Sequence, residues 1–191
     1  MKNSSDNKVV DLFKHTNTSA KVLNISDSFE MKRGGHLSNV NVAYEAWGSL
    51  NSDKSNVIVI FTGLSASSHV TSSPSDQAPG WWETMVGDGK AIDTSKYYVI
   101  CINTLGSCFG STSPVSINEQ TNQPYRLTFP ELTVEDMANA SQLLLDKIGI
   151  KRIHLLIGPS LGGMKAIAFS ILHNSIVDNL ILISTATQAL P

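Results

Sequence analysis

The sequence predicts an α/β fold in which helices flank a mostly parallel sheet. Short apolar runs alternate along the chain with turn-rich or helical segments, as expected when strands and crossover helices follow one another. The apolar runs have the length of strands, far short of a membrane-spanning helix. Hydrophobic residues make up 41% of the 191 residues and charged residues 16%, which is typical of one folded globular domain.

Five segments carry the expected strands. Residues 40–47 alternate between apolar and polar side chains, which predicts a strand with one solvated face. The other four segments are continuously apolar, as strands covered on both faces should be. They are residues 56–61, 97–102, 154–157 and 180–183.

Two helices are expected between these strands. The first begins after Thr133, which can cap it, with Asp136 at the capping-box position where Glu or Gln is usual. Apolar residues then recur at helical spacing until Gly149 ends the segment. The second helix is expected over residues 161–172.

Residues 62–80 and 103–130 are expected to be two long loops. Both are rich in turn-forming residues and lack periodicity. Each follows the carboxyl end of an expected strand, which is the edge where α/β sheets build their sites. Because long loops in compact domains usually carry function or are disordered, these two segments are the first places to look for a site.

Charge and cysteine content exclude several classes of function. The net charge of −2 gives no electrostatic reason for binding nucleic acid or an anionic membrane. Cys101 and Cys108 form neither a disulfide framework nor a metal-binding pair, so we expect no metal and a reduced, cytoplasmic compartment. The polar residues 1–20 have no apolar signal region and are expected to be frayed or disordered.

The pattern Gly-Pro-Ser-Leu-Gly at residues 158–162 carries the clearest chemical signal. A G-x-S-x-G match is weak evidence alone, but here a buried strand leads into it and a helix leads out. That context is required by a nucleophile elbow, whose tight turn needs small residues at Gly158 and Gly162. We therefore predict Ser160 as a catalytic nucleophile. A non-catalytic glycine-rich turn is the alternative, and no G-x-G-x-x-G or Walker A pattern supports a nucleotide site.

The elbow also suggests where an oxyanion would be stabilised. Ser160 would lie at a helix N-terminus, where free N–H groups favour developing negative charge. The backbone N–H of Leu161 is the first expected donor, and Leu64, in the loop after the strand ending at Phe61, is the candidate second donor. Three further candidates for the substrate pocket share these loops and are Gly63, Ser65 and Asn103. For Asn103, a hydrogen bond to the neighbouring loop is the first expectation.

Seven segments, in order and spacing, resemble the homoserine O-acyltransferase family of the α/β-hydrolase superfamily. They are residues 43–51, 62–70, 80–83, 87–94, 103–114, 129–136 and 158–164. The resemblance implies an α/β-hydrolase fold and an acyl-CoA-dependent enzyme of methionine biosynthesis that acylates homoserine through an acyl-serine intermediate, by ping-pong kinetics. It implies acetyl-CoA or another acyl-CoA as co-substrate, no bound cofactor, only small-molecule substrates (homoserine or serine as acceptor) and a homodimer for the complete chain.

Three positions depart from the family pattern. The family has His-Ala-Leu-Thr-Gly where this chain has Thr-Gly-Leu-Ser-Ala at residues 62–66. Pro159 stands where the family has glycine, and Asp88 stands where it has proline. Proline favours an extended conformation at Gly158, which suits a strand end, so we expect Pro159 to be tolerated. These departures leave open the donor, acetyl or succinyl, and the acceptor, homoserine or serine.

The rest of a catalytic triad is not found in the sequence. In this fold an Asp and then a His follow the serine, but after Ser160 the chain offers only His173 and Asp178, in the opposite order. Both are expected at the far edge of the sheet. His69 lies in an active-face loop and is expected to be structural.

The simplest interpretation is that residues 21–191 form a partial domain, apparently truncated after the strand that follows the nucleophile helix. The remaining strands, the cap, and the acid and base of the triad would then be missing, and an open sheet edge would favour self-association. Two other functions stay open: a serine esterase of the same fold, and a non-catalytic fragment or interaction module. Trp81 and Trp82 are expected to pack the loop, and Lys165 to face solvent.

Overall fold

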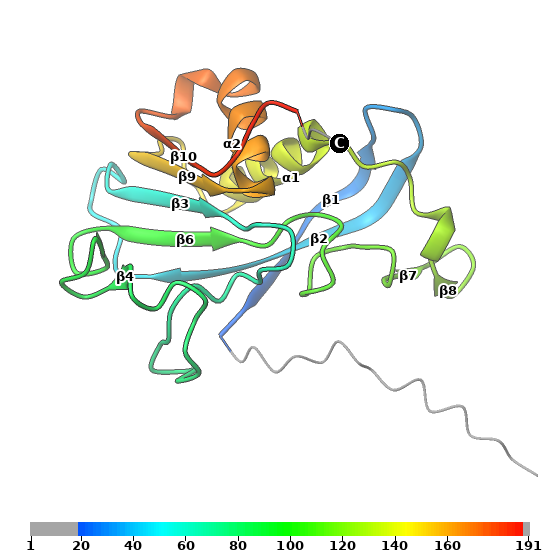
Figure 1. Ribbon diagram of the computed structural model, residues 1–191. Helices are drawn as coiled ribbons and strands as arrows, with labels where there is room; N and C mark the ends of the chain where they lie inside the picture. Colours follow the sequence, from blue (N-terminus) through cyan, green and yellow to red (C-terminus); the bar gives the residue numbers. More distant parts are fainter. Residues whose placement is uncertain (1–18, 189–191) are drawn as a thin grey trace, which may run out of the picture.

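The computed structural model describes residues 19–188, and its centre is a six-stranded sheet (Figure 1). The strands lie in the order β1-β2-β6-β3-β9-β10. The pairs β1–β2 and β2–β6 are antiparallel, whereas β6, β3, β9 and β10 are parallel to one another. The six strands are β1 (Lys21–Glu30), β2 (His36–Trp47), β3 (Val57–Phe61), β6 (Tyr98–Ile102), β9 (Leu155–Pro159) and β10 (Leu180–Ile183). The expected α/β fold with a mostly parallel sheet is confirmed.

Both predicted helices are present, α1 at Val134–Lys147 and α2 at Leu161–Leu172. Thr133 caps α1 as expected: its hydroxyl accepts from the Asp136 N–H at 3.2 Å, and the Asp136 carboxylate accepts from the Thr133 N–H at 2.9 Å. This reciprocal pair satisfies two N–H groups that the helix itself leaves without acceptors.

Short strand pairs lie after the first expected loop (residues 62–80) and within the second (residues 103–130). In the first of the two long connections, β4 (Val86–Gly87) pairs with β5 (Ile92–Asp93); in the second, β7 (Ile117–Asn118) pairs with β8 (Gln123–Pro124). Two 3-10 turns, η1 and η2, occupy Arg126–Thr128 and Asn174–Ile176.

The sheet separates two apolar cores. Helices α1 and α2 lie together on one side of the sheet, where Phe61 packs edge-to-face against Phe169 with 5.5 Å between ring centroids (Figure 1). The other side is covered by the connection between β3 and β6, which brings Val70 and Val86 against Cys101. Both faces of the central strands are therefore buried, which explains their continuously apolar sequences.

Strand β1 was not predicted, and β2 begins earlier than residue 40. Strand β1 mixes polar and apolar residues without a clean period of two, and its register with β2 shifts between Asn24 and Ser26. Because of this irregularity the sequence shows no strand pattern, and β1 is defined by its long antiparallel pairing with β2. The expected frayed terminus lies almost entirely outside the described residues, but Ser19 is placed and its hydroxyl donates to Glu45 at 2.5 Å.

Strand β10 forms an apolar edge of the sheet. It pairs with β9 on one side, and no strand among residues 19–188 pairs with its other side. Its side chains point alternately to both faces and keep 36–45% of their surface exposed; they are Leu180, Ile181, Leu182 and Ile183. Such an edge is a template for pairing with another strand.

We therefore expect the 191-residue chain to self-associate through β10. Substituting Ile181→Lys places a charge on this edge and should lower the association constant by about tenfold or more. Sedimentation velocity over a concentration series measures the effect. Leu127→Lys is the matched control, because Leu127 is fully exposed on η1. A wild-type chain that stays monomeric at every concentration would contradict the prediction.

Candidate active site

Ser160 lies at the turn between β9 and α2 in a strained backbone conformation. Its φ is 52° and its ψ is −123°, a region that residues other than glycine rarely adopt. The Ser160 N–H donates to the Ile183 carbonyl at 2.9 Å. Its carbonyl accepts from the Gly163 N–H at 2.9 Å and from the Thr185 hydroxyl at 2.8 Å. Contacts from α2, from β10 and from the segment after β10 therefore hold this strained residue in place.

Gly158 and Gly162 are required by space. A Cβ atom built on Gly158 would lie 2.3 Å from the Gly162 carbonyl oxygen, and one built on Gly162 would lie 2.4 Å from the Phe61 carbonyl oxygen. Gly158 is extended, within β9, and Pro159 continues the strand opposite Ile183, as the sequence led us to expect. The small residues therefore let β9, α2 and the end of β3 approach one another closely.

The Ser160 side chain opens into a hollow of about 500 Å³. The residues that line it come from the loop after β3, the start of α2 and the segment after β10; they are Leu64, Ser160, Leu161, Met164, Ser184, Thr185, Ala186 and Gln188. The segment after β10 was not predicted as part of the site. Only the position of this segment in the chain could have indicated its role, because it follows a parallel strand at the edge where the other loops lie.

The two candidate oxyanion donors flank this hollow. Leu161 is the first residue of α2, and neither its N–H nor that of Leu64 donates to an acceptor among the described residues. A Cβ atom built on Gly63 would lie 3.9 Å from the Ser160 Cβ atom, so this loop passes directly beside the serine. Leu64 and Leu161 thus line the same hollow as Ser160, and their role as oxyanion donors stays a prediction.

The other candidates for the substrate pocket do not line the hollow. Asn103 is fully buried, and its amide braces the next loop by donating to the Phe109 carbonyl at 2.9 Å. Ser65 follows Leu64 but is not among the lining residues. The bracing hydrogen bond, which was the first expectation for Asn103, is the contact observed, and its substrate role stays a prediction.

None of the four described histidines lines the hollow. His36 is exposed on β2, and His154 stacks on Tyr97 with 5.4 Å between ring centroids. His173, at the far end of α2, lies 3.1 Å from the Asn139 side-chain oxygen.

His69 has both ring nitrogens in contacts of its own, to Glu45 and Ala78. Asp178 pairs with Arg152 at 2.8 Å. Residues 19–188 thus place no acid–base pair beside Ser160.

Lys165 is buried, which corrects the expectation that it faces solvent. It is 0% exposed, its ammonium lies 4.0 Å from the centroid of the Phe61 ring, and it has no hydrogen-bond partner among the described residues. Burial lowers its pKa from 10.5 to about 7. The expectation was wrong because Lys165 lies on the side of α2 that packs against the sheet.

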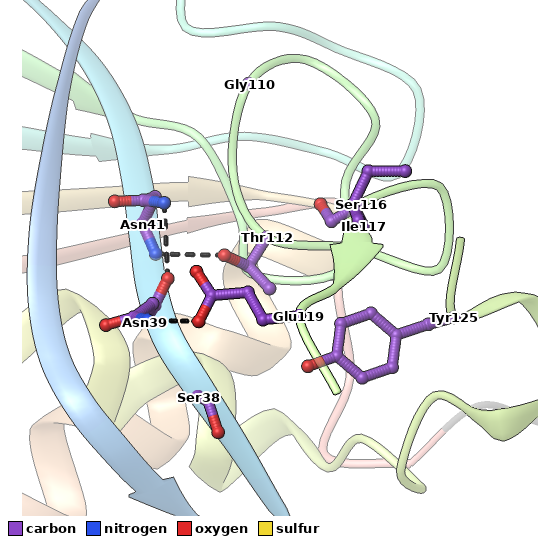
Figure 2. A pocket seen from close by; sticks show the side chains of 9 residues that line it. All are labelled: Ser38, Asn39, Asn41, Gly110, Thr112, Ser116, Ile117, Glu119 and Tyr125. Atoms are coloured by element: carbon purple, nitrogen blue, oxygen red, sulfur yellow. Dashed lines mark hydrogen bonds between the residues drawn. The ribbon is translucent and has the colours of Figure 1, made fainter. Parts of the chain in front are cut away.

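A second pocket lies apart from Ser160, between β2 and the β7–β8 hairpin (Figure 2). It has a volume of about 260 Å³ and shares no lining residue with the serine hollow. The Asn39 amide donates to the Glu119 carboxylate at 2.6 Å, and the Asn41 N–H donates to the Thr112 hydroxyl at 2.9 Å across it (Figure 2). These contacts tie the hairpin to β2.

The described residues hold neither a membrane-spanning helix nor a cluster of metal ligands. No described helix is long and apolar enough to span a bilayer. Within residues 19–188, no group of three or more His, Cys, Asp or Glu side chains is arranged to hold a metal ion.

The chain is similar to acyltransferases of known sequence. It is 50% identical over 161 residues to a serine O-succinyltransferase of Litchfieldella anticariensis, a match covering 84% of this chain and 44% of that protein. It is 45% identical over 172 residues to an L-serine/homoserine O-acetyltransferase of Streptomyces lavendulae, covering 90% of this chain and 46% of that protein. The predicted resemblance is thereby confirmed, and the chain spans less than half the length of these relatives.

Solved structures agree with the fold. The homoserine O-acetyltransferase of Bacillus anthracis superposes with a TM-score of 0.82 at 34% identity, over 90% of this chain and 48% of that chain. Esterase E22 superposes with a TM-score of 0.81 at 38% identity, over 88% of this chain and 48% of that chain. Residues 56–191 also match the family model described as alpha/beta hydrolase fold. The chain therefore belongs to the α/β hydrolase fold family.

Proposed function

We propose that the protein is an O-acyltransferase that moves an acetyl or succinyl group from coenzyme A to the hydroxyl of serine or homoserine. The observation that carries the proposal is the strained Ser160, which faces the hollow between the Leu161 and Leu64 amides. The names of the relatives support the reaction class, because serine O-succinyltransferases and an L-serine/homoserine O-acetyltransferase match most of this chain.

The proposed reaction has two transfers. The Ser160 oxygen attacks the thioester carbonyl while a base takes its proton, and the two N–H groups stabilise the oxyanion. The carbon–sulfur bond then breaks, and coenzyme A leaves as the thiol after taking up a proton. The hydroxyl of the acceptor next attacks the acyl-serine ester and gives its proton to the base; the bond between the acyl carbon and the Ser160 oxygen then breaks, and the base returns the proton to that oxygen. Residues 19–188 do not supply that base, so the complete reaction belongs to the whole protein.

The residues that line the hollow bear on the choice between an acetyl and a succinyl donor. No Lys or Arg side chain lines the described part of the hollow, so nothing described there would pair with the free carboxylate of a succinyl group. The described lining is compatible with the uncharged acetyl group, whereas the names of several matching relatives favour succinyl. Both donors belong in the test.

A serine esterase is the second candidate. The likeness to esterase E22 favours it, because that structure superposes as well as the acyltransferase does. The two reactions share the acyl-serine intermediate and differ only in whether water or an amino-acid hydroxyl accepts the acyl group.

The test follows thiol release from acetyl-CoA and succinyl-CoA, with and without L-serine or L-homoserine. We expect release to depend on the acceptor, with the O-acyl amino acid as product and no activity in Ser160→Ala. Thiol release that no acceptor changes, with free acetate or succinate as product, would instead support the esterase.

A further inference from the structure

The loop after β3 is fastened to the sheet by His69 and Glu45. His69 Nδ1 lies 3.0 Å from a Glu45 carboxylate oxygen, and Nε2 lies 2.8 Å from the Ala78 carbonyl oxygen. The Glu45 side chain is 1% exposed and the His69 side chain 11%. The hydroxyl of Ser68 donates to the other Glu45 oxygen at 3.2 Å. The buried Glu45 carboxylate on β2 thus contacts the side chains of two consecutive loop residues.

Hydrogen-bond chemistry requires a proton in this contact. A carbonyl oxygen only accepts, so Nε2 of His69 must carry a hydrogen. A second proton must lie between Nδ1 and the Glu45 oxygen, because two lone pairs would otherwise face each other at 3.0 Å. A neutral imidazole has one N–H, so removing a proton leaves either the Glu45 oxygen or the Ala78 carbonyl without its donor, and the loop keeps only one of these two attachments.

The same loop carries the candidate oxyanion donor. Leu64 lines the Ser160 hollow at the start of the loop, and the His69 contact fixes the loop a few residues further on. The His69 carbonyl also accepts from the Trp81 N–H at 3.2 Å, and the Trp81 indole donates to the Ser67 carbonyl at 2.8 Å. The position of Leu64 therefore depends on a loop that His69 helps to attach to the sheet, together with the hydrogen bonds of Ser68 to Glu45 and of the Trp47 indole to the Ser72 carbonyl.

We propose that His69 is a positioning residue: in its protonated form it holds, through both ring nitrogens, the loop that presents the Leu64 amide to Ser160, and on losing its proton it gives up one of these two contacts and loosens that loop. The role of Leu64 as an oxyanion donor rests on the proposed function. The attachment itself rests only on the contacts of His69.

The charged groups around His69 determine the direction of the effect. Glu45 faces it from β2 and Asp76 from its own loop; Lys21 of β1 lines the same pocket as Glu45, and Cys101 of β6 is the strand partner of Glu45. Burial alone lowers the pKa of His69, but the hydrogen bonds to Glu45 and Ala78 outweigh it and leave the pKa above 6.5. Burial raises the pKa of the Cys101 thiol well above its ordinary value, which keeps that neighbour neutral.

A raised pKa gives a loss on the alkaline side. The folded state holds the His69 proton more tightly than the unfolded state does, so the attachment contributes fully below pH 6.5. It is lost as the pH rises through the pKa of His69 in the folded protein. The loop should therefore loosen at alkaline pH while the rest of the sheet stays intact.

The test measures hydrogen-exchange protection of residues 62–80 as a function of pH. In the wild type, we expect protection factors in this loop to fall about tenfold as His69 deprotonates, with α1 unchanged. His69→Gln cannot titrate and should remove the pH dependence; His69→Ala should leave the loop loose at every pH. His36→Gln is the control, because His36 is exposed at the start of β2. Protection that is independent of pH in the wild type, or a transition that persists in His69→Gln, overturns the attachment.

A second readout separates positioning from mere structure. The rate at which Ser160 reacts with a fluorophosphonate probe is measured from pH 5 to 10 with a fixed concentration of free imidazole base. We expect the ratio of the wild-type rate to the His69→Gln rate to fall about tenfold along the same transition as the loop. A constant ratio overturns the positioning role. If the loop and the probe behave as expected but coenzyme A thioesters do not acylate Ser160, the proposed function fails and the His69 inference stands.

Discussion

Substituting Lys165→Met should stabilise the protein by about 2–4 kcal/mol near pH 7. The wild type buries an ammonium group that lies over the Phe61 ring and has no hydrogen-bond partner among the described residues. Its pKa falls from 10.5 to about 7, a shift worth roughly 5 kcal/mol between the charged and neutral forms. Methionine has a similar length, no charge and good helix propensity, so it removes the cost and keeps most of the packing.

The sign of the pH dependence follows from the lowered pKa. Between about pH 7 and pH 10.5 the unfolded chain keeps the Lys165 proton and the folded protein has released it. Wild-type stability should therefore rise with pH across this window, and the advantage of Lys165→Met should shrink. Urea denaturation at pH 7 and near pH 10 measures both effects.

Lys147→Met, at an exposed position of α1, is the control and should change stability by less than about 0.5 kcal/mol. A Lys165→Met variant that is less stable than the wild type at pH 7 would show that the ammonium has a stabilising partner in solution.

Substituting Gly162→Ala should destabilise the protein by about 3 kcal/mol. Glycine to alanine within a helix normally stabilises by up to about 1 kcal/mol, so the expected sign is the opposite of the helix propensity. The added Cβ would lie 2.4 Å from the Phe61 carbonyl oxygen and 2.7 Å from the Thr62 carbonyl oxygen. Both are backbone atoms at the end of a central strand, so relief requires moving α2 away from β3.

The same displacement should reach the site. Thr62 leads directly into Gly63 and Leu64, so moving its carbonyl shifts the second candidate oxyanion donor away from Ser160. Thermal and urea denaturation measure the loss. Gly63→Ala is the matched control, because its added Cβ would meet only ordinary contacts, at 3.8 Å or more. Equal stability of Gly162→Ala and wild type would contradict the close approach of α2 to β3.

The parts of the fold that were predictable are those encoded locally. Strands β3, β6 and β9 are apolar because both their faces are largely buried, and their sequences show it; β10 carries the same apolar pattern although its side chains are exposed among the described residues. The elbow could be predicted because its residues are contiguous: strand, small residue, Ser160, small residue, helix. The Thr133–Asp136 capping box is likewise local.

The parts that were not predictable depend on contacts distant in sequence. Strand β1 is defined by pairing with β2 rather than by its own pattern. The burial of Lys165 contradicts the usual preference of lysine for water, and only the packing of α2 on β3 reveals it. The His69–Glu45 contact joins a loop to β2, and nothing in the sequence of the loop indicates this partner. Thr185, which holds the Ser160 carbonyl, meets it only because β10 lies beside β9.

The most direct measurement of the central claim is the site of acylation. The 191-residue chain is incubated with acetyl-CoA or succinyl-CoA and increasing imidazole, which supplies the base that residues 19–188 do not place beside Ser160. Peptide mass spectrometry then locates the acyl group. We expect imidazole-dependent acylation of Ser160, none at that peptide in Ser160→Ala, and release of the group by L-serine or L-homoserine. Acylation spread over other serines, or unchanged in Ser160→Ala, would contradict the assignment of Ser160 as the nucleophile.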